Sequence, residues 1–520
     1  MATAADLLSA AARRWPEAPA LWRDGSHLTY GELDRRVDQV AAWLADACPL
    51  RGSRIGVWLD KRVDTVVALF AAMRAGHVAL PLNPAVRASQ ALASLAEAQA
   101  ALLLSDYGRL QALTAADHAR PWRGVDVDDA AWQREVHSLA GCPPPIRRDS
   151  QELAILFYTS GSSGAPKGVM VTHANLLAGA AAMNACLGHR PDDRLLAALP
   201  LSFDAGFSQL TTAFAAGASV ALVDHLFPAD LLVALDRYAI TGILAVPPLY
   251  LQLQQAIEAA HRADLAGAPG AASLRYFANT GGQLPAANWQ WLQAVWPHAA
   301  PHALYGLTEA FRASALPPHE FERKPESVGV ALPGGTRLHL LRQDGSFCAS
   351  GEAGELVQQG PLVARGYWND PARSAERFRP GPDGEPAVWS GDTLRCDDEG
   401  YLWFIGRKDG QIKTSGYRVS PTEVESVAAA AGWPECVATG LPDRWLGEVI
   451  TLAVASDDIS GLANALRSGL PTWMHPRHIE VWPGALPRTA NGKFDRVLIR
   501  QQLLTRLATT ATDHAGDGND

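Results

Sequence analysis

The sequence has no long hydrophobic run, no paired-cysteine motif and no excess of positive charge. No apolar stretch reaches the roughly 20 residues that a membrane-spanning helix needs, so we do not expect a membrane protein. The net charge of -9 argues against a nucleic-acid partner, which requires a basic surface. We therefore expect a small substrate or an individual protein partner.

The cysteines are scattered along the chain without CxxC or Cys/His spacing, so the sequence predicts neither a disulfide framework nor a zinc site. Reduced thiols in a cytoplasmic protein are the best interpretation. The N-terminal residues 1–22 carry Arg13 and Arg14 in an amphipathic pattern, and we do not expect a signal peptide there. The cysteines are Cys48, Cys142, Cys186, Cys348, Cys396 and Cys436.

The chain of 520 residues is too long for one compact core, and its composition of 48% hydrophobic and 19% charged residues is that of a globular protein. From about residue 28, helix-period and strand-like segments alternate. This alternation predicts an α/β fold with two parallel sheets covered by helices on both faces. The strand-like segments include residues 53–59, 77–82, 194–201, 219–224, 240–248 and 274–282.

Two changes of pattern divide the rest of the chain. After about residue 325, short strands with Gly and Asp turns predict a small β-barrel or distorted sheet. Beyond the glycine-rich segment 406–416, helical and strand-like segments predict a compact α+β unit. We expect an N-terminal domain at 1–408, a mobile C-terminal domain at 409–506 and a disordered tail at 507–520, which lacks apolar periodicity.

The loop YTSGSSGAPKG, residues 158–168, follows a strand-like run and leaves many backbone N–H groups without partners. Such loops bind anions, although a glycine-rich turn can equally be a plain connection. The Walker motif is not met, because Pro166 precedes Lys167 and Gly168 follows it. The loop suits a triphosphate that is held loosely enough for pyrophosphate to leave.

More motifs follow this loop in a fixed order: YGLTEAF at 305–311, SGDTLRC at 390–396, GRKDGQIKTSGYRVSPTEVE at 406–425 and LPRTANGKFDR at 486–496. With them the chain resembles the AMP-forming acyl/aminoacyl ligase superfamily of acyl-CoA synthetases, non-ribosomal peptide adenylation domains and luciferases. The resemblance covers nearly all of residues 1–500. The subgroup it most resembles is the AMP-forming ligases associated with exosortase systems, judging from PLSFDAGFSQL at 200–210 and the 305–312 and 412–425 segments.

The resemblance implies an ATP-dependent reaction in which a carboxylate attacks the α-phosphate and expels pyrophosphate. The acyl group then passes from AMP to the thiol of coenzyme A or of a carrier protein. A carboxylate is already a nucleophile at neutral pH, so the first step needs alignment and charge stabilisation rather than a general base.

The same resemblance implies roles for individual residues. Thr308 would contact phosphate, and Glu309 would hold Mg²⁺, a cation that prefers oxygen ligands. Tyr305 would pack on adenine, Asp392 would accept hydrogen bonds from the ribose hydroxyls, and Arg407 would support the ribose and phosphate. The phosphates would be wrapped by Thr159, Ser160, Gly161, Ser162, Ser163 and Gly164, with Lys167 assisting, and the adenine edge would meet the backbone near Gly281 and Gly282.

Lys493 is the implied catalytic residue, because the lysine of the C-terminal turn reaches the α-phosphate and the substrate carboxylate in the family. Asp409 lies where the family places its hinge, and Gly416 would line the thiol tunnel after the domain rotates, although Gly416 can also be a simple turn glycine. Trp473 departs from the tyrosine that the family more often carries. No carrier domain follows Arg506, so we expect a separate carrier chain.

The identity of the acid is less determined. Asp204 lies where amino-acid-activating members carry the aspartate that binds the substrate ammonium, and Arg312 is expected to face the same pocket. Either both residues meet charges on an amino acid, which can have a second acidic group, or they pair with each other and the substrate is a neutral acyl chain. The other expected pocket residues are Ala205, Ser208, Ala245, Ala278 and Leu304.

Two other function classes stay open. An inert AMP-binding or scaffold protein usually shows erosion of the phosphate loop, the metal carboxylate or the terminal lysine, and here all three are present. A luciferase-like oxidation also stays open, because no residue in this sequence distinguishes an oxidative enzyme from a ligase.

Overall fold

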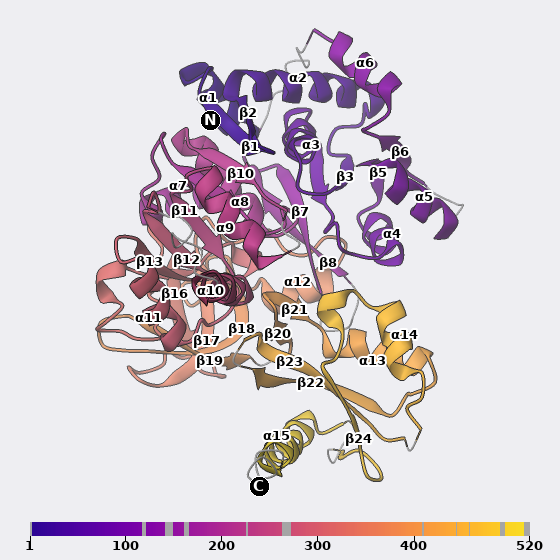
Figure 1. Ribbon diagram of the computed structural model, residues 1–520, viewed down its shortest axis with the longest axis vertical. Coiled ribbons are helices and arrows are strands. Elements are labelled where there is room, and N and C mark those ends of the chain that lie inside the picture. The colour runs from indigo at the N-terminus through magenta and orange to yellow at the C-terminus, as the bar shows by residue number, and fades with distance from the viewer. Residues whose placement is uncertain are drawn as a thin grey trace. The chain divides into compact units, whose positions relative to one another are not determined.

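The computed structural model describes residues 3–116, 121–140, 149–160, 166–224, 227–262, 272–407, 410–443, 445–456, 458–488 and 494–513. The chain forms two compact units, one made of residues 1–159 and 167–406 and the other of residues 160–166 and 407–520. Figure 1 shows the elements of the first unit in indigo to orange and the end of the second in yellow. The expected boundary between 408 and 409 stays a prediction.

A nine-stranded sheet forms the centre of the first unit, in the order β15-β14-β13-β12-β11-β9-β10-β1-β2. The strands from β13 to β1 run parallel, and the strands at the two edges are antiparallel. Strands buried on both faces read as continuous apolar runs, as GILA does in β11. The strands are β1 (Pro19–Arg23), β2 (Ser26–Thr29), β9 (Arg194–Ala197), β10 (Ser219–Leu222), β11 (Gly242–Ala245), β12 (Tyr276–Asn279), β13 (Ala300–Tyr305), β14 (Ser314–Leu316) and β15 (Val330–Ala331).

A second sheet of six strands has the order β6-β5-β3-β4-β7-β8, and the pairings from β6 to β7 are parallel. The predicted α/β class with two parallel helix-covered sheets is therefore confirmed. The phosphate loop predicted from the sequence connects β7 to β8, and residues 161–165 of it lie outside the described residues. The strands are β3 (Arg54–Trp58), β4 (Val78–Pro81), β5 (Ala100–Ser105), β6 (Arg123–Asp126), β7 (Leu153–Ser160) and β8 (Pro166–Thr172).

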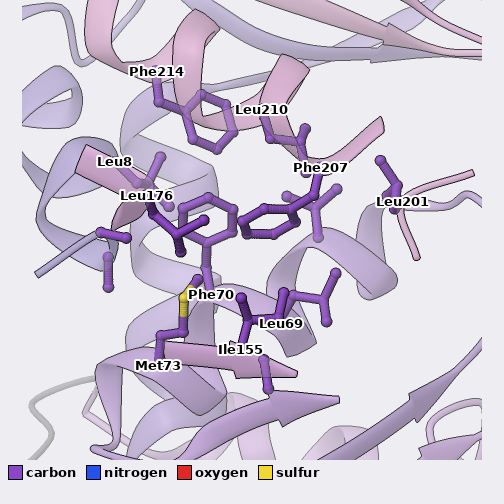
Figure 2. Close-up of a cluster of buried hydrophobic side chains, with 14 of the residues drawn as sticks. Leu8, Leu69, Phe70, Met73, Ile155, Leu176, Leu201, Phe207, Leu210 and Phe214 are labelled. Carbon is purple, nitrogen blue, oxygen red and sulfur yellow. The ribbon is translucent and has the colours of Figure 1, made fainter. Parts of the chain in front are cut away.

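Helices α3 and α8 join the two sheets through an aromatic cluster. Phe70 of α3 stacks on Phe207 of α8 at 5.8 Å and meets the edge of Phe214 at 5.2 Å (Figure 2). These side chains are fully buried, so they hold α8 firmly and fix the start of this helix at Asp204. The helices of the unit are α1 (Ala5–Arg14), α2 (Tyr30–Ala47), α3 (Val63–Arg74), α4 (Ala88–Glu97), α5 (Tyr107–Ala116), α6 (Ala130–Ser138), α7 (His173–Leu187), α8 (Asp204–Ala216), α9 (Pro228–Arg237), α10 (Pro247–Arg262), α11 (Ala286–Val295), α12 (Pro371–Arg377), and the 3₁₀ turns η1 (Thr308–Ala310) and η2 (Pro318–Glu320).

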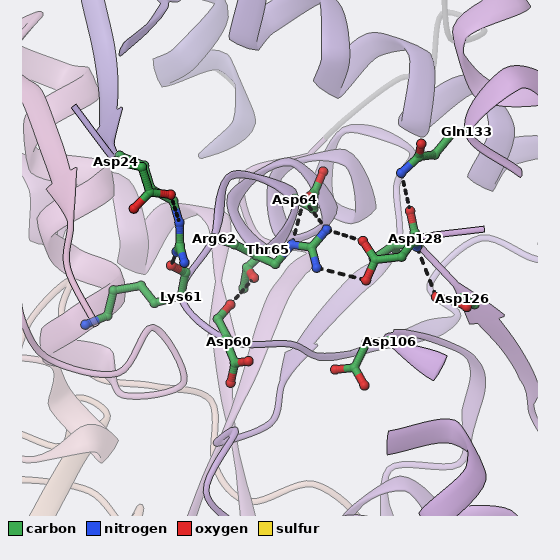
Figure 3. Close-up of polar contacts among 12 residues, drawn as sticks. Asp24, Asp60, Lys61, Arg62, Asp64, Thr65, Asp106, Asp126, Asp128 and Gln133 are labelled. Atoms are coloured by element: carbon green, nitrogen blue, oxygen red, sulfur yellow. Dashed lines mark hydrogen bonds and ion pairs between the residues drawn. The ribbon is translucent and has the colours of Figure 1, made fainter. Parts of the chain in front are cut away.

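A buried lysine ties the loop after β3 to the nine-stranded sheet. Lys61 donates from Nζ to the carbonyl oxygens of Ala198 and Val223, at 2.8 and 2.9 Å, just beyond the ends of β9 and β10. Burial lowers the pKa of Lys61 to about 8. The next residue, Arg62, forms ion pairs with Asp64 and Asp128 on the other side of the loop (Figure 3). The chain segment that leads from β9 to Asp204 is thereby supported from the neighbouring sheet.

A four-stranded antiparallel sheet follows, with the open order β16-β17-β18-β19. This order agrees with the distorted-sheet alternative for the region after residue 325. The register shifts between Glu355 and Val357 of β17, because β18 carries extra residues there around Gly391, where φ is +69°. The strands are β16 (Arg337–Leu341), β17 (Ala353–Gln359), β18 (Ala387–Cys396) and β19 (Leu402–Arg407).

The second unit is a small α+β fold with its own core, in which the sheet β21-β20-β23-β22 also pairs β23 with β24. Helix α15 runs to Asp513, into the segment 507–520 that was expected to be disordered. The reason is that Ile499, Leu503 and Leu507, four residues apart, continue an apolar stripe past Arg506. The elements are β20 (Ile412–Thr414), β21 (Tyr417–Val419), β22 (Cys436–Asp443), β23 (Gly447–Val454), β24 (His478–Val481), α13 (Pro421–Ala430), α14 (Leu462–Gly469), η3 (Thr472–Met474) and α15 (Arg496–Asp513).

Among the described residues, every helix is too short or too polar to cross a lipid bilayer. The described cysteines, which exclude Cys142, are free thiols.

Candidate active site

The predicted site residues of the first unit gather where the parallel strands of the nine-stranded sheet end. Asp204 begins α8 after β9, Gly281 and Gly282 follow β12, and Tyr305 ends β13. Loops at the carboxyl ends of parallel strands meet at one edge of the sheet, which is the usual ligand site of open α/β folds. The topology thus brings together segments that are a hundred residues apart in the sequence.

The register of the strands corrects one pocket residue. Ala278 is level with Leu244, whereas Ala245 is level with Asn279, so Ala278 and Ala245 lie on opposite faces of the sheet. Ala278 belongs to the same core cluster as Ala205 and Leu304, and the pocket role of these residues stays a prediction. Ala245 instead packs among the side chains under α9, α10 and α11, and is not a pocket residue on the side of Asp204.

Asp204 and Arg312 form a buried ion pair. Nη1 of Arg312 lies 2.9 Å from Oδ2 of Asp204, and the side chains are 3% and 14% exposed. The hydroxyl of Thr308 lies 3.4 Å from the other carboxylate oxygen, Oδ1. The Nε and Nη2 atoms of Arg312 are buried and have no hydrogen-bond partner among the described residues. The guanidinium therefore has donors left for an acceptor in this pocket.

Ser208 lies one helical turn after Asp204 and is buried, with its hydroxyl donating to the Ala205 carbonyl oxygen at 2.8 Å. The close approach of α8 to the preceding loop requires glycine at position 206, because a Cβ there would lie 2.0 Å from the Pro200 carbonyl oxygen. The helix start is thus packed tightly against the segment that precedes it.

A strained turn holds the segment from Tyr305 to Arg312. Phe311 has φ 58° and ψ -82°, a conformation that non-glycine residues rarely adopt. A Cβ at Gly306 would lie 2.6 Å from the Phe311 carbonyl oxygen, and the amide of Gln358 donates to the carbonyl oxygens of Ala310 and Arg312. These contacts hold the backbone of Phe311 in its strained conformation. Strained backbone of this kind is common at functional sites.

Glu309 is buried in this turn and is oriented by a tyrosine that sequence reasoning missed. The hydroxyl of Tyr367 donates to Oε1 of Glu309 at 2.8 Å, and the ammonium of Lys167 lies 5.2 Å from the centre of the Tyr367 ring. Glu309 and Lys167 therefore both contact one side chain, which is 58 residues from Glu309 in the sequence. No sequence pattern near Tyr367 indicated this.

The chemistry of Glu309 suits Mg²⁺ held mainly by substrate phosphates. Within the described ranges there is no group of three or more His, Cys, Asp or Glu residues that could form an all-protein metal site. Mg²⁺ commonly uses only one or two carboxylates together with phosphate oxygens and water. Glu309 offers one oriented carboxylate, which is the number of protein carboxylates that such a site requires.

Tyr305 and Asp392 are joined directly. The Tyr305 hydroxyl donates to Oδ2 of Asp392 at 2.5 Å, and Asp392 is completely buried in β18. Its backbone N–H is bonded to the Ser390 hydroxyl, which fixes the carboxylate next to the ring. The expected adenine-packing ring and ribose-binding carboxylate are therefore neighbours.

The remaining predicted residues belong to the second unit or lie outside the described residues. Gly416 has φ +79° in the turn between β20 and β21, so it needs the freedom of glycine as a turn residue, and the tunnel role stays a prediction. Trp473 stacks on the adjacent Tyr417 at 4.5 Å, which makes it a packing residue of this hairpin. Thr159 ends the described part of the loop on the β7 side, and the side chains of Ser160 and Arg407 are not described. Gly161, Ser162, Ser163, Gly164, Asp409 and Lys493 lie outside the described residues.

Sequence comparison identifies relatives that span most of this chain. A model of the AMP-binding enzyme family matches residues 8–368. An L-proline–[L-prolyl-carrier protein] ligase of Pseudomonas fluorescens is 29% identical over 510 residues, covering 94% of this chain and 97% of that protein. Malpibaldin synthetase of Mortierella alpina is 30% identical over 501 residues, but the chain spans only 9% of its length.

Solved structures share the fold. The o-succinylbenzoate CoA synthetase MenE of Bacillus subtilis superposes with a TM-score of 0.82 at 26% identity, covering 95% of this chain and 98% of that one. The complex of VinN with L-aspartate has a TM-score of 0.69 at 30% identity, covering 78% of this chain and 98% of that one.

The resemblance drawn from the motifs is thereby confirmed, while the finer assignment to exosortase-associated ligases stays a prediction. The family match covers the segments that carry Asp204, Tyr305 and Glu309, and the match to MenE covers 95% of the chain. The chain belongs to the AMP-binding enzyme family and is an AMP-forming ligase.

Proposed function

We propose that the protein activates an amino acid as an aminoacyl-adenylate, with release of pyrophosphate, and then transfers it to the pantetheine thiol of a separate carrier protein. The observation that carries the proposal is the buried carboxylate of Asp204 at the start of α8, beside Thr308. A carboxylate offers about four lone pairs, so Asp204 can accept a hydrogen bond from a substrate ammonium and keep its bond to Arg312. The carrier-protein relative supports the same reaction.

The substrates and cations of the first half-reaction are ATP, the acid and Mg²⁺. The family resemblance assigns Glu309 to the metal, Lys167 to the departing phosphates and Lys493, which lies outside the described residues, to the α-phosphate. When bound, Mg²⁺ would neutralise charge on the phosphate oxygens. Tyr367 keeps Glu309 in one orientation, so the carboxylate does not have to be reordered when nucleotide and metal arrive.

Arg312 favours an amino acid that has a second acidic group. Its Nε and Nη2 atoms are buried without a partner among the described residues, and a buried guanidinium donor left unpaired costs free energy. A carboxylate is the acceptor that matches two guanidinium donors best. VinN, which has been solved with L-aspartate, is a relative of similar fold and supports this choice.

The alternative is an acyl-CoA ligase for a fatty or aryl acid. The ion pair itself favours it, because Asp204 and Arg312 already neutralise each other and the nearby Ala205 and Ala278 are small and apolar. The two functions differ in what the pocket requires of the ligand: an ammonium group or only an apolar chain.

ATP–pyrophosphate exchange across a panel of amino, aryl and alkyl acids tests the proposal. We expect activity with amino acids, and more with aspartate- or glutamate-like acids than with neutral ones. Arg312→Ala should remove the preference for the second acidic group, whereas Arg337→Ala, on the exposed edge of β16, should leave it unchanged. Activity with fatty or aryl acids and none with any amino acid would establish the alternative. The rate of aminoacyl transfer to a phosphopantetheinylated carrier protein is then compared with the rate of transfer to coenzyme A, and the faster reaction identifies the acceptor.

A further inference from the structure

Asn279, the last residue of β12, carries a buried acceptor that the structure leaves unused. Its side-chain Nδ2 donates to the Gly282 carbonyl oxygen at 2.8 Å, and the residue is 3% exposed. A carbonyl can only accept, so this bond fixes the amide with Oδ1 turned the other way. That oxygen is buried and has no hydrogen-bond partner among the described residues.

The surroundings of this oxygen on the sheet are apolar and small. Asn279 is level with Ala245 on one neighbouring strand and with Ala303 on the other, and methyl groups offer no donor. Ala303 lies two residues before Tyr305 on β13, so both point to the same face as Asn279. The Asn279 side chain therefore lies on the same face of the sheet as the Tyr305 ring, with Ala303 between them.

The bond to Gly282 connects the same amide to the segment where the family resemblance places the adenine edge. Gly281 has φ +75°, and a Cβ at Gly282 would lie 3.1 Å from the ring of Pro247, so this turn is closely packed. Asn279 holds the turn with its nitrogen and presents its oxygen beside it.

We propose that Oδ1 of Asn279 accepts a hydrogen bond from the exocyclic amine of adenine and so selects ATP over GTP; this rests on the proposed adenylate-forming function. Adenine has a donor at its six-position, whereas guanine has a carbonyl acceptor there. A buried acceptor that faces another acceptor, or nothing, is costly, so the base without the amine is disfavoured. Asn279 is a specificity residue for the nucleotide and takes no part in the chemical step.

Equilibrium binding of ATP, GTP and purine riboside triphosphate, which has the adenine ring without the amine, tests the proposal directly. For the unmodified protein we expect affinity for the purine analogue to be about 10- to 100-fold lower than for ATP, and GTP to be no better. Asn279→Ala should bind ATP and the analogue within about threefold of each other. Asn288→Ala, on the neighbouring α11 with its amide bonded to Gln254, should keep the full difference.

The two proposals fail in different ways. Equal affinity of the unmodified protein for ATP and the purine analogue would overturn the role of Asn279, whether or not pyrophosphate exchange occurs. Tight ATP binding without ATP–pyrophosphate exchange for any acid would overturn the proposed function. The affinities for ATP and the purine analogue would still decide the role of Asn279. If Asn279→Ala does not fold, as thermal unfolding would reveal, the comparison on the unmodified protein still decides.

Discussion

Arg312 and Asp204 lie 108 positions apart in the sequence, yet Nη1 of one is 2.9 Å from Oδ2 of the other, and the two side chains are mostly buried. Removing one member of a buried pair leaves the other charge without compensation, which commonly costs about 3–5 kcal/mol. The pair therefore has consequences for stability as well as for substrate choice.

Asp204→Asn should lower the free energy of unfolding of the first unit by about 3 kcal/mol and reduce amino-acid-dependent pyrophosphate exchange by at least about 100-fold. Denaturant unfolding and exchange assays measure the two effects. Asp224→Asn is the control, since Asp224 is half exposed and its contact with Arg23 is 3.4 Å long. An unchanged exchange rate in Asp204→Asn would remove this carboxylate from substrate recognition.

Lys493→Ala should reduce the rate of adenylate formation by about 10²–10³, because charge at the α-phosphate builds up in the transition state. Lys167→Ala should cost less than about tenfold, since Lys167 is expected to contact the departing pyrophosphate. Single-turnover formation of adenylate compares the two variants. Equal losses, or a larger loss at Lys167, would contradict the assignment of Lys493 as the catalytic lysine.

Tyr305→Phe keeps the ring that is expected to pack on adenine and deletes the hydroxyl that donates to Asp392 at 2.5 Å. A hydrogen bond to a charged group is worth about 1.5–3 kcal/mol, so the buried carboxylate loses its orientation. We expect the dissociation constant for ATP to rise about tenfold. Tyr107→Phe, at a side chain that is 65% exposed, should change nothing. ATP affinity that is the same in both variants would show that the bond does not position Asp392 for ribose.

Acidification should destabilise the first unit through His302. Burial lowers the pKa of this imidazole to about 4, and the ring stacks edge-on against Tyr276. Between pH 6.5 and 4 the unfolded chain binds a proton that the folded chain does not, so stability falls as pH falls through this window. The loss is on the order of 3 kcal/mol.

Denaturant unfolding at pH 7, 5.5 and 4.5 measures this slope. His302→Gln should flatten it, whereas His319→Gln, at an exposed side chain, should not. The carboxylate of Asp193 adds to the loss at lower pH: burial acts to raise its pKa, but hydrogen bonds from Arg275 and Thr241 hold it below its usual range. His189 lies against the same Tyr276 ring, and burial also lowers its pKa to about 4, so it contributes in the same window. A slope that His302→Gln leaves intact would assign the acid sensitivity to His189 or to carboxylates such as Asp193.

Much of the fold followed from local pattern. The apolar runs at 53–59, 77–82 and 219–224 contain β3, β4 and β10. Parallel strands that are buried on both faces carry apolar side chains at consecutive positions, so they can be found from the local sequence. The segments expected at 194–201, 240–248 and 274–282 likewise contain β9, β11 and β12. Each of these depends only on neighbouring residues.

Other features depended on distant partners. Ala245 was expected among the small residues of the pocket, but strand register turns its side chain to the face opposite Ala278. Tyr367 was not predicted as a site residue. It is 58 residues from Glu309 in the sequence, and only the folded chain brings the two side chains together. Helix α15 continued past Arg506 because Leu507 had a core to pack against.

The sequence by itself determined the order of strands and helices and the identity of the motif residues, because periodicity and turn chemistry act over a few positions. Only the tertiary structure decided which side chains meet: that Arg312 pairs with Asp204, that Tyr367 orients Glu309 and that the Asn279 side-chain oxygen has no partner in the part of the chain that the structure describes. Such contacts are set by sheet register and by the packing of separate elements, and no local pattern encodes them.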